Sequence, residues 1–447
     1  MKLHLPTSHF TALACLLAHC VQLCAAEPKT ANPNNYRRAL KTLVSGDTLT
    51  LEAGIYPAGL PISDLKGNAK EWITIQGPAA GVAEIHQTSG SNCVELWQCS
   101  YLALKNLTIK GEGIDGIFGI SAKGGLANLV HHILIEGCII SEWNTSQQDV
   151  GISTKTPTWN WTIRGNKILN CGTGLYLGNS NGADPFVRGI IENNLVQNPI
   201  GYCMEIKFQK PRPTIPGMPV EPSSTLIRHN VFIKSDAPSP DGDRPNLLVG
   251  GFPDSDPGAG DLYEIYGNLL CHNPRESLLQ ASGRAAIHDN VFVDSTASGH
   301  AAITLRNHDS PLKLAHVYNN TIYAATRGIN IPNAAPEGHA VIGNLVFATT
   351  PMTLHGSMVK VSANLTDSPA SAAKYLMNPS VKLGAMNLFP KNGQCQDAAV
   401  DLSAFASQTD SDLDFNRKPK GGRTFRGAYA GQGTNPGWQL QSDLKRQ

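Results

Sequence analysis

The chain has 447 residues, of which 41% are hydrophobic and only 16% are charged, with 43 glycines, 29 prolines and a formal net charge of +1. A net charge so close to zero argues against binding to a nucleic acid or an anionic membrane through the overall electrostatic field of the protein. We therefore expect neither of them as a partner.

The first 26 residues have the composition of a secretory signal peptide. Lys2 precedes a broken apolar run, and small residues stand before Glu27. The apolar run is too short to span a bilayer, and no other segment has the roughly 20 apolar residues of a membrane helix. A lipoprotein anchor at Cys24 is the weaker alternative, because Leu23 before it is not small. The sequence thus predicts a signal peptide at 1–26 and a secreted protein, periplasmic or extracellular, without a membrane span.

Ten cysteines occur, and seven of them follow the signal peptide. None has the spacing of a CxxC or Cys/His metal site. Cys93 and Cys99 are close enough in sequence to pair, although an odd count leaves at least one free thiol. We expect most of the seven to be small buried side chains of the core.

A short repeat, an aliphatic residue followed by two others and then Asn, recurs along the chain. Its copies end at Asn166, Asn194, Asn230, Asn268, Asn290, Asn320 and Asn344. A loose period of this length, with short β-like runs and Asn or Gly turns, indicates a solenoid. Its coils would stack ~4.8 Å apart, and Asn at one fixed turn position tolerates left-handed backbone and bonds to the Asn of the next coil.

The fold class predicted from this repeat is all-β, a single-stranded right-handed parallel β-helix with a short N-terminal capping helix at 36–43. One domain is expected over 27–447, with coils at about 45–365 and a C-terminal cap and tail at about 366–447. The last residues, 432–447, are expected to be loosely ordered.

Two N-terminal stretches carry a resemblance to a known superfamily. Gly-Asp-Thr-Leu-x-Leu-x-x-Gly-x-Tyr ends at Tyr56, and Tyr-Leu-x-Leu-Lys-Asn-Leu-Thr-Ile spans 101–109. With the Asn repeats, these resemble secreted parallel β-helix proteins of the pectate-lyase-like superfamily over about residues 35–430. The N-terminal strands are most similar to the polysaccharide lyase family that contains alginate lyases and chondroitinase B. The superfamily also contains glycoside hydrolases, epimerases and non-catalytic adhesins, so the resemblance specifies the fold more than the activity.

The strands that follow the Asn turns place polar side chains on one outer face, because alternate residues of a strand point to opposite sides. These side chains are Lys155, Tyr176, Glu205, Lys207, Gln280, Thr304, Arg306, His308 and Asn330. Two long insertions, 210–222 with Arg212 and 235–260 with Arg244, are expected to wall this face. Such a face predicts a groove for an acidic polysaccharide. The alternative is a solvated strand face whose charges serve only solubility.

Glu205 and Lys207 are the strongest local pair, since they lie two residues apart on one side of one strand. Lyases of uronic-acid polymers need a positive group on the substrate carboxylate and a base near the adjacent carbon. The resembling family implies a Lys base, a nearby Arg and a calcium ion held by Glu and Asn ligands. We therefore predict Lys207, Glu205 and Arg244 as catalytic residues, with Glu205 as a ligand of calcium.

The predicted substrate-binding residues are Lys155, Tyr176, Arg212, Gln280, Arg306 and His308. Lys207 and Arg306 would lie three coils, or ~14 Å, apart, so the family mechanism does not transfer as a unit. The leading hypothesis is a secreted, monomeric polysaccharide lyase that acts by β-elimination. A non-catalytic carbohydrate-binding or cell-surface β-helix is the alternative. A glycoside hydrolase of the same fold is less favoured because no Asp-Asp pair occurs.

Overall fold

The computed structural model describes residues 1, 29–87, 92–255, 257–355 and 359–446. Except for Met1, the predicted signal peptide lies outside these residues. No helix within the described ranges is long and apolar enough to cross a membrane.

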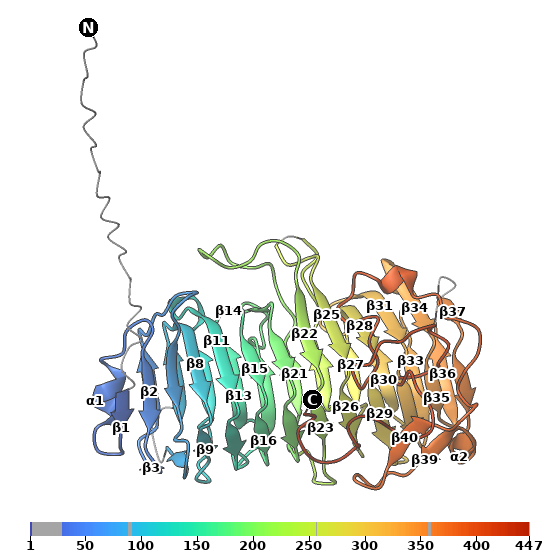
Figure 1. Ribbon diagram of the computed structural model, residues 1–447, viewed down its shortest axis with the longest axis horizontal. Helices are drawn as coiled ribbons and strands as arrows, with labels where there is room; N and C mark the ends of the chain where they lie inside the picture. The colour runs from blue at the N-terminus through green and yellow to red at the C-terminus, as the bar shows by residue number, and fades with distance from the viewer. Residues whose placement is uncertain (2–28, 88–91, 256, 356–358, 447) are drawn as a thin grey trace.

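Three long sheets of parallel strands run the length of the molecule and form a right-handed parallel β-helix (Figure 1). The fifteen-stranded sheet contains β1 (Lys29–Ala31), β2 (Thr48–Leu51), β5 (Ile73–Gln76), β8 (Ser100–Lys105), β11 (Val130–Glu136), β15 (Thr162–Arg164), β19 (Ile190–Glu192), β22 (Ser224–Arg228), β25 (Leu262–Tyr266), β28 (Gly283–His288), β31 (Leu312–Tyr318), β34 (Gly338–Ile342) and β37 (Lys360–Ser362), with β14 (Thr158–Trp159) and β18 (Phe186–Val187) at its side.

The eleven-stranded sheet contains β4 (Leu60–Ser63), β7 (Val94–Trp97), β10 (Ile120–Lys123), β13 (Val150–Lys155), β17 (Thr173–Leu177), β21 (Met204–Ile206), β24 (Leu247–Val249), β27 (Leu279–Ala281), β30 (Ala301–Leu305), β33 (Arg327–Ile331) and β36 (Thr350–Leu354). The twelve-stranded sheet contains β3 (Gly54–Tyr56), β6 (Ala83–Ile85), β9 (Thr108–Lys110), β12 (Ile139–Ser141), β16 (Lys167–Leu169), β20 (Leu195–Gln197), β23 (Val231–Ile233), β26 (Leu269–Cys271), β29 (Val291–Asp294), β32 (Thr321–Ala324), β35 (Leu345–Phe347) and β38 (Leu365–Asp367). Each coil therefore contributes one strand to each sheet, and its inward aliphatic residues pack on those of the coils above and below.

Helical structure is confined to short segments. Helix α1 (Tyr36–Leu40) buries Tyr36 and Leu40 at the first coil, as a cap requires, but strand β1 precedes it, so it is not the first element. Helix α2 (Ala372–Tyr375) and the antiparallel pair β39 (Leu376–Asn378) and β40 (Asn387–Pro390) follow the last coil. Single 3-10 turns occupy Gly125–Ala127, Pro369–Ser371 and Ser403–Phe405.

The repeated asparagines form a continuous buried ladder. The side-chain amide of each asparagine donates to the side-chain oxygen of the next, over 2.9–3.0 Å, from Asn166 through Asn344 to Asn364. That oxygen also accepts the backbone N–H of the asparagine one coil earlier. The ladder satisfies buried backbone groups at the turn where the strand ladders stop.

All seven cysteines of the described chain are buried with free thiols. Cys93 and Cys99 therefore do not pair. Burial raises the pKa of the Cys99 thiol to about 11, which keeps it protonated and unreactive at neutral pH. The interpretation of these residues as small core side chains is the one that the structure supports.

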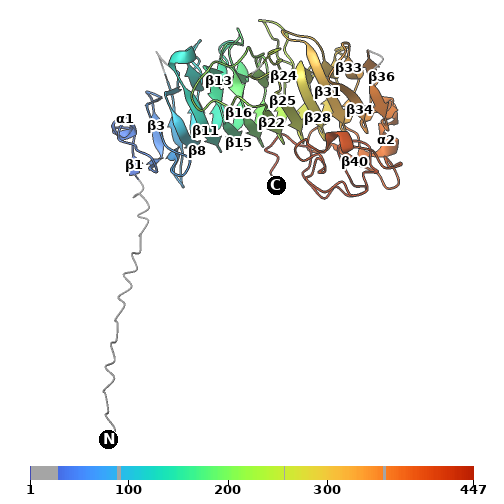
Figure 2. The ribbon, with the colours of Figure 1, turned by 90° about the horizontal axis from the view of Figure 1, so that it is seen from above.

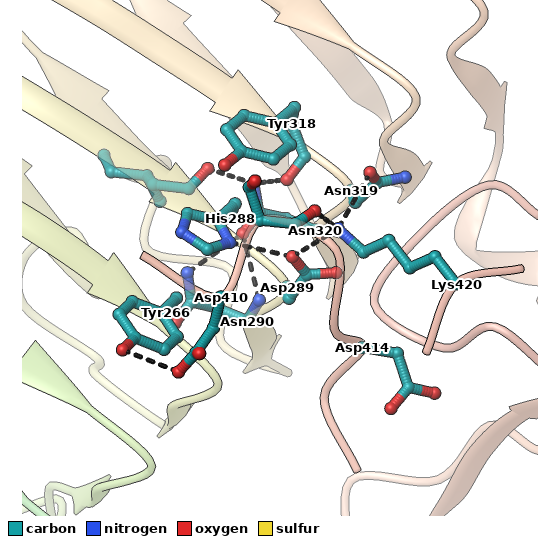
Figure 3. Close-up of polar contacts among 12 residues, drawn as sticks. Tyr266, His288, Asp289, Asn290, Tyr318, Asn319, Asn320, Asp410, Asp414 and Lys420 are labelled. Carbon is teal, nitrogen blue, oxygen red and sulfur yellow. Dashed lines mark hydrogen bonds and ion pairs between the residues drawn. The ribbon is translucent and has the colours of Figure 1, made fainter. Parts of the chain in front are cut away.

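The C-terminal tail folds back over the fifteen-stranded and twelve-stranded sheets (Figure 2). In Figure 3, Lys420 of the tail reaches Asp289, with 2.7 Å between Nζ and Oδ2, and the His288 ring lies stacked between Tyr266 and Tyr318. Further along, Ser442 donates to Gln197. The expectation that 432–447 is loosely ordered is therefore wrong for the described residues up to 446, because polar anchors and buried apolar side chains attach them to the coils.

Candidate active site

A cleft of about 290 Å³ opens on the outer face of the eleven-stranded sheet. Its lining contains Lys155, Tyr176, Glu205, Lys207 and Arg244, together with Gln147, Gln148, Val150, Thr173, Ser180 and Tyr202. Five of the nine residues predicted for the site thus meet in one place. They come from β13, β17 and β21, and from the insertion that precedes β24.

The strand register explains why the first four residues meet. Tyr176 pairs directly with Glu205 of the next coil. By the same registers, Lys155 and Lys207 occupy one row, with Gly178 on the coil between them. Since Gly178 carries no side chain, the ring of Tyr176 from the same coil lies between the two lysines, with its centre 5.3 Å from the Lys155 Nζ and 5.9 Å from the Lys207 Nζ. A Cβ at Gly178 would lie 3.4 Å from the Lys207 Cβ, and its φ of +88° also disfavours any other residue.

Glu205 is the acidic centre of this cleft. It is 1% exposed, and its Oε1 lies 2.8 Å from the Lys207 Nζ. Burial raises the pKa of the Glu205 carboxyl, and Lys207, Arg244 and His308 oppose that rise. A buried carboxylate in contact with an amine fixes that amine in position, so Glu205 orients Lys207 toward the cleft.

Lys155 has a different environment from Lys207. Its Nζ lies 5.1 Å from the ring centre of Phe118 and 5.3 Å from that of Tyr176. No carboxylate of the described chain forms an ion pair with it. Burial lowers the pKa of the Lys155 amine, and the neighbouring Lys123 lowers it further. Lys155 therefore gives up its proton more readily than a lysine in water does.

The two tyrosines of the cleft retain their protons at neutral pH. Burial raises the pKa of Tyr176 to about 12, and the charge of Glu205 adds to the rise. Burial also raises the pKa of the Tyr202 hydroxyl, with Glu205 adding to it. The guanidinium of Arg244 lies over the ring of Tyr202, with the Arg244 Cζ 5.6 Å from the ring centre. Both hydroxyls are thus available as proton donors.

Arg244 reaches the cleft because its insertion folds back over three coils. The Gln147 side chain donates to the Gly242 carbonyl over 2.9 Å and accepts the Asp241 N–H over 3.1 Å. At the base of the loop, the buried amine of Lys234 donates to the Arg244 carbonyl over 2.9 Å. This insertion therefore walls the cleft, as expected from the sequence.

Arg212 does not reach the cleft, which corrects its prediction as a substrate-binding residue. Its guanidinium is buried against Asp261 and donates to the Pro219 carbonyl. The insertion that carries it also places Met218 in a small apolar cluster with Trp159 and Val187, strands β14 and β18. An arginine held between the carboxylate of Asp261 and a carbonyl of its own loop attaches that loop to the coils.

Gln280, Arg306 and His308 lie further along the same sheet. Gln280 is two coils from Glu205 in the register, and its Oε1 accepts a long hydrogen bond of 3.4 Å from Arg306. His308 lies 3.3 Å from Asp309. These three do not line the cleft, but they continue its outer face toward the C-terminal coils.

Calcium does not fit the residues of this cleft. Ca²⁺ takes six to eight oxygen ligands, whereas Glu205 is the one carboxylate in the lining and is ion-paired with Lys207. Within the described ranges, no three His, Cys, Asp or Glu residues are grouped as metal ligands would be. We therefore derive no step of the chemistry through calcium.

Sequence reasoning missed Tyr202 and the pair Gln147 and Gln148 in the lining of the cleft, and Lys123 beside Lys155. Lys123 follows the same Ile-Ser-x-Lys pattern as Lys155, and the two residues pair in the register of β10 and β13. That pattern was a usable signal. The other residues lie in turns and loops, where no periodicity marks them.

Comparisons with known proteins agree with the fold. No protein-family model and no curated protein matches the sequence. Among solved structures, the chain is similar to the PL6 family alginate lyase AlyGC, at 16% identity and a TM-score of 0.47 over 76% of this chain and 51% of that one. It therefore spans about half the length of that lyase.

Two further structures are similar over most of their own length. The A-module of the mannuronan C-5 epimerase AlgE4 from Azotobacter vinelandii matches at 17% identity and a TM-score of 0.45, over 73% of this chain and 93% of that one. Pectate lyase Pel9A matches at 12% identity and a TM-score of 0.47, over 94% and 97%. At these levels the likeness concerns the fold, which the three parallel sheets define independently.

Proposed function

We propose that this protein is a secreted, monomeric polysaccharide lyase that cleaves a uronic-acid-containing polymer by β-elimination. The observation that carries the proposal is the cleft in which three basic side chains, Lys155, Lys207 and Arg244, surround one buried carboxylate and two protonated tyrosines. The excess of positive charge suits a substrate with one carboxylate per sugar. The named activities of the similar structures are consistent with an acidic polysaccharide.

β-Elimination requires three tasks of the protein. Lys207, fixed by Glu205, and Arg244 bind the carboxylate of the reacting sugar and stabilise the charge that develops on it. Lys155, whose amine loses its proton more readily, takes the proton from the carbon next to that carboxylate. The electron pair of this C–H bond forms the new double bond, and the glycosidic C–O bond breaks. The Tyr176 hydroxyl gives its proton to the leaving oxygen.

These roles assign the base to Lys155 and carboxylate binding to Lys207, whereas the sequence favours Lys207 as the base. The reason is that burial lowers the pKa of the Lys155 amine, whereas the Lys207 amine is held in an ion pair by Glu205. Both lysines touch the substrate in this proposal. A hydrolase of this fold needs a second carboxylate, and Glu205 is the sole carboxylate in the lining of the cleft.

The experiment is a screen of alginate, pectate and glycosaminoglycans for the ultraviolet absorbance of unsaturated uronate. We expect a rise with at least one polymer. Lys155→Met should abolish turnover while polymer binding persists, and Lys207→Met should raise KM and lower kcat by a smaller factor. Lys110→Met, on the twelve-stranded sheet, is the matched control. A folded protein that gives no rise with any polymer would overturn the elimination and favour the non-catalytic binding protein.

A further inference from the structure

An exposed tryptophan lies on the same sheet as the cleft, toward the N-terminal end. Trp97 ends β7 and is 37% exposed, which is unusual for so large an apolar side chain. The registers of β7, β10 and β13 bring Trp97, Lys123 and Lys155 into one row on the outer face. Trp97 is therefore two coils, or ~10 Å, from Lys155.

The Trp97 ring is held in place by the turn after β10. A Cβ at Gly124 would come within 2.7 Å of the ring atom Cζ3, so the ring packs directly on this glycine, whose φ is +132°. The side chain of the buried Asn128 donates to the Leu96 carbonyl over 3.0 Å and to the Lys123 carbonyl over 2.9 Å. The same Asn128 accepts the N–H of Gln98 over 2.7 Å. These contacts fix the Trp97 ring and the ends of β7 and β10 before any ligand binds, which reduces the conformational entropy lost on binding.

Lys123, between the tryptophan and the cleft, is a cation without a counter-charge. It is exposed, and no ion pair joins it to any residue of the described ranges. Its direct neighbour in the register is another lysine, Lys155. An anionic group of the substrate can therefore bind Lys123 without breaking an ion pair. Glu95 lies on the neighbouring row with Ser121 and Ser153, where a carboxylate can accept hydrogen bonds from sugar hydroxyls.

We propose that Trp97 and Lys123 form a separate sugar-binding subsite for an acidic polysaccharide, two coils from the reacting bond. This inference rests on the proposed function, since it places the rest of the polysaccharide along the row of side chains that leads to Lys155. The Trp97 ring stacks on the apolar face of a pyranose ring. Lys123 binds a carboxylate of the sugar that lies between Trp97 and the cleft. One coil advances ~4.8 Å, a distance close to the length of one sugar in an extended chain. The subsite therefore selects for chain length.

The test measures binding in the Lys155→Met background, so that turnover does not interfere. The probes are oligosaccharides of alginate and of polygalacturonate, with two and with six residues, in isothermal titration. For the hexamer of at least one polymer, Trp97→Ala should weaken binding about tenfold, whereas Trp97→Phe should restore most of it. Dimer binding should change less than about twofold, because a dimer fills the cleft alone.

Lys123→Ala should weaken hexamer binding and reduce its salt dependence, whereas Lys110→Ala should change neither. A Trp97→Ala effect of equal size on dimer and hexamer, no effect on either, or hexamers that do not bind at all would each overturn the subsite. The proposed function is judged separately by the absorbance assay on the wild-type protein. Length-dependent binding without cleavage would support the subsite and refute the lyase, and cleavage without length dependence would do the reverse.

Discussion

Removal of one asparagine from the middle of the ladder tests the physical basis of the fold. The Asn268 side-chain oxygen accepts both the N–H and the side-chain amide of Asn230, over 2.8 and 3.0 Å. Its own amide donates to the Ile227 carbonyl, the Tyr266 carbonyl and Asn290. All of this lies in a fully buried turn, so water cannot replace the lost partners.

We expect Asn268→Ala to lower the free energy of unfolding by about 5–7 kcal/mol. An orphaned buried N–H at Asn230 costs about 1–3 kcal/mol, and the remaining lost hydrogen bonds contribute about 1 kcal/mol each. Asn364→Ala is the matched control, because Asn364 ends the ladder and is only partly buried. Solvent reaches Asn364 and can take its place beside Asn344, so its loss should cost about 1–2 kcal/mol.

The assay is urea denaturation followed by circular dichroism and by tryptophan fluorescence, with coincident transitions as the check on two-state behaviour. Hydrogen exchange of the Asn230 amide in each variant reports the local effect. Equal losses for Asn268→Ala and Asn364→Ala would refute the reasoning, because the position in the ladder would then have no effect. A loss below about 1 kcal/mol for Asn268→Ala would refute it as well.

Three further outcomes follow from the structure. Glu205→Gln should lower kcat/KM about ten- to hundredfold by releasing Lys207, since a charge-assisted hydrogen bond contributes about 1.5–3 kcal/mol; restoration by added calcium would instead indicate a metal ligand. Lys420→Met should cost about 3–5 kcal/mol in thermal or urea unfolding by leaving Asp289 buried without its cation, and the further change Asp289→Asn should recover part of it. Burial lowers the pKa of His316 to about 4, so the stability from its neutral form is complete above pH 6.5 and falls by up to about 1.4 kcal/mol per pH unit down to pH 4. His316→Gln should remove that part of the slope in urea titrations at several pH values.

The fold and the row of polar side chains could be predicted because both follow from local periodicity. An Asn at a fixed turn marks every coil, and the alternation of each strand then determines which side chains point outward. The alternation and the strand register alone bring four residues together in the cleft, namely Lys155, Tyr176, Glu205 and Lys207. A solenoid thus reveals more of its surface through sequence than a globular sheet does, since neighbours in space are separated by one repeat.

The loops and the tail could not be predicted in this way. Arg212 is fixed by Asp261, which lies 49 residues further along the chain, and no repeat connects the two. The tail is anchored by contacts such as Ser442 with Gln197, which are 245 residues apart. Such contacts depend on the path of irregular segments, where side-chain chemistry and not spacing determines the partner.

Two glycines interrupt the row of outward residues that contains Lys155 and Lys207. Lys155 and Lys207 share a row, and the coils at Gly178 and Gly250 contribute only glycine to it. A Cβ at Gly250 would lie 2.2 Å from the backbone nitrogen of Phe208, so neither position accepts a larger residue. Gly178 therefore keeps the two lysines two coils apart, and Gly250 ends the row of side chains one coil beyond Lys207. An uninterrupted row of lysines would be a flat cationic surface, whereas here the Tyr176 ring separates the two amines.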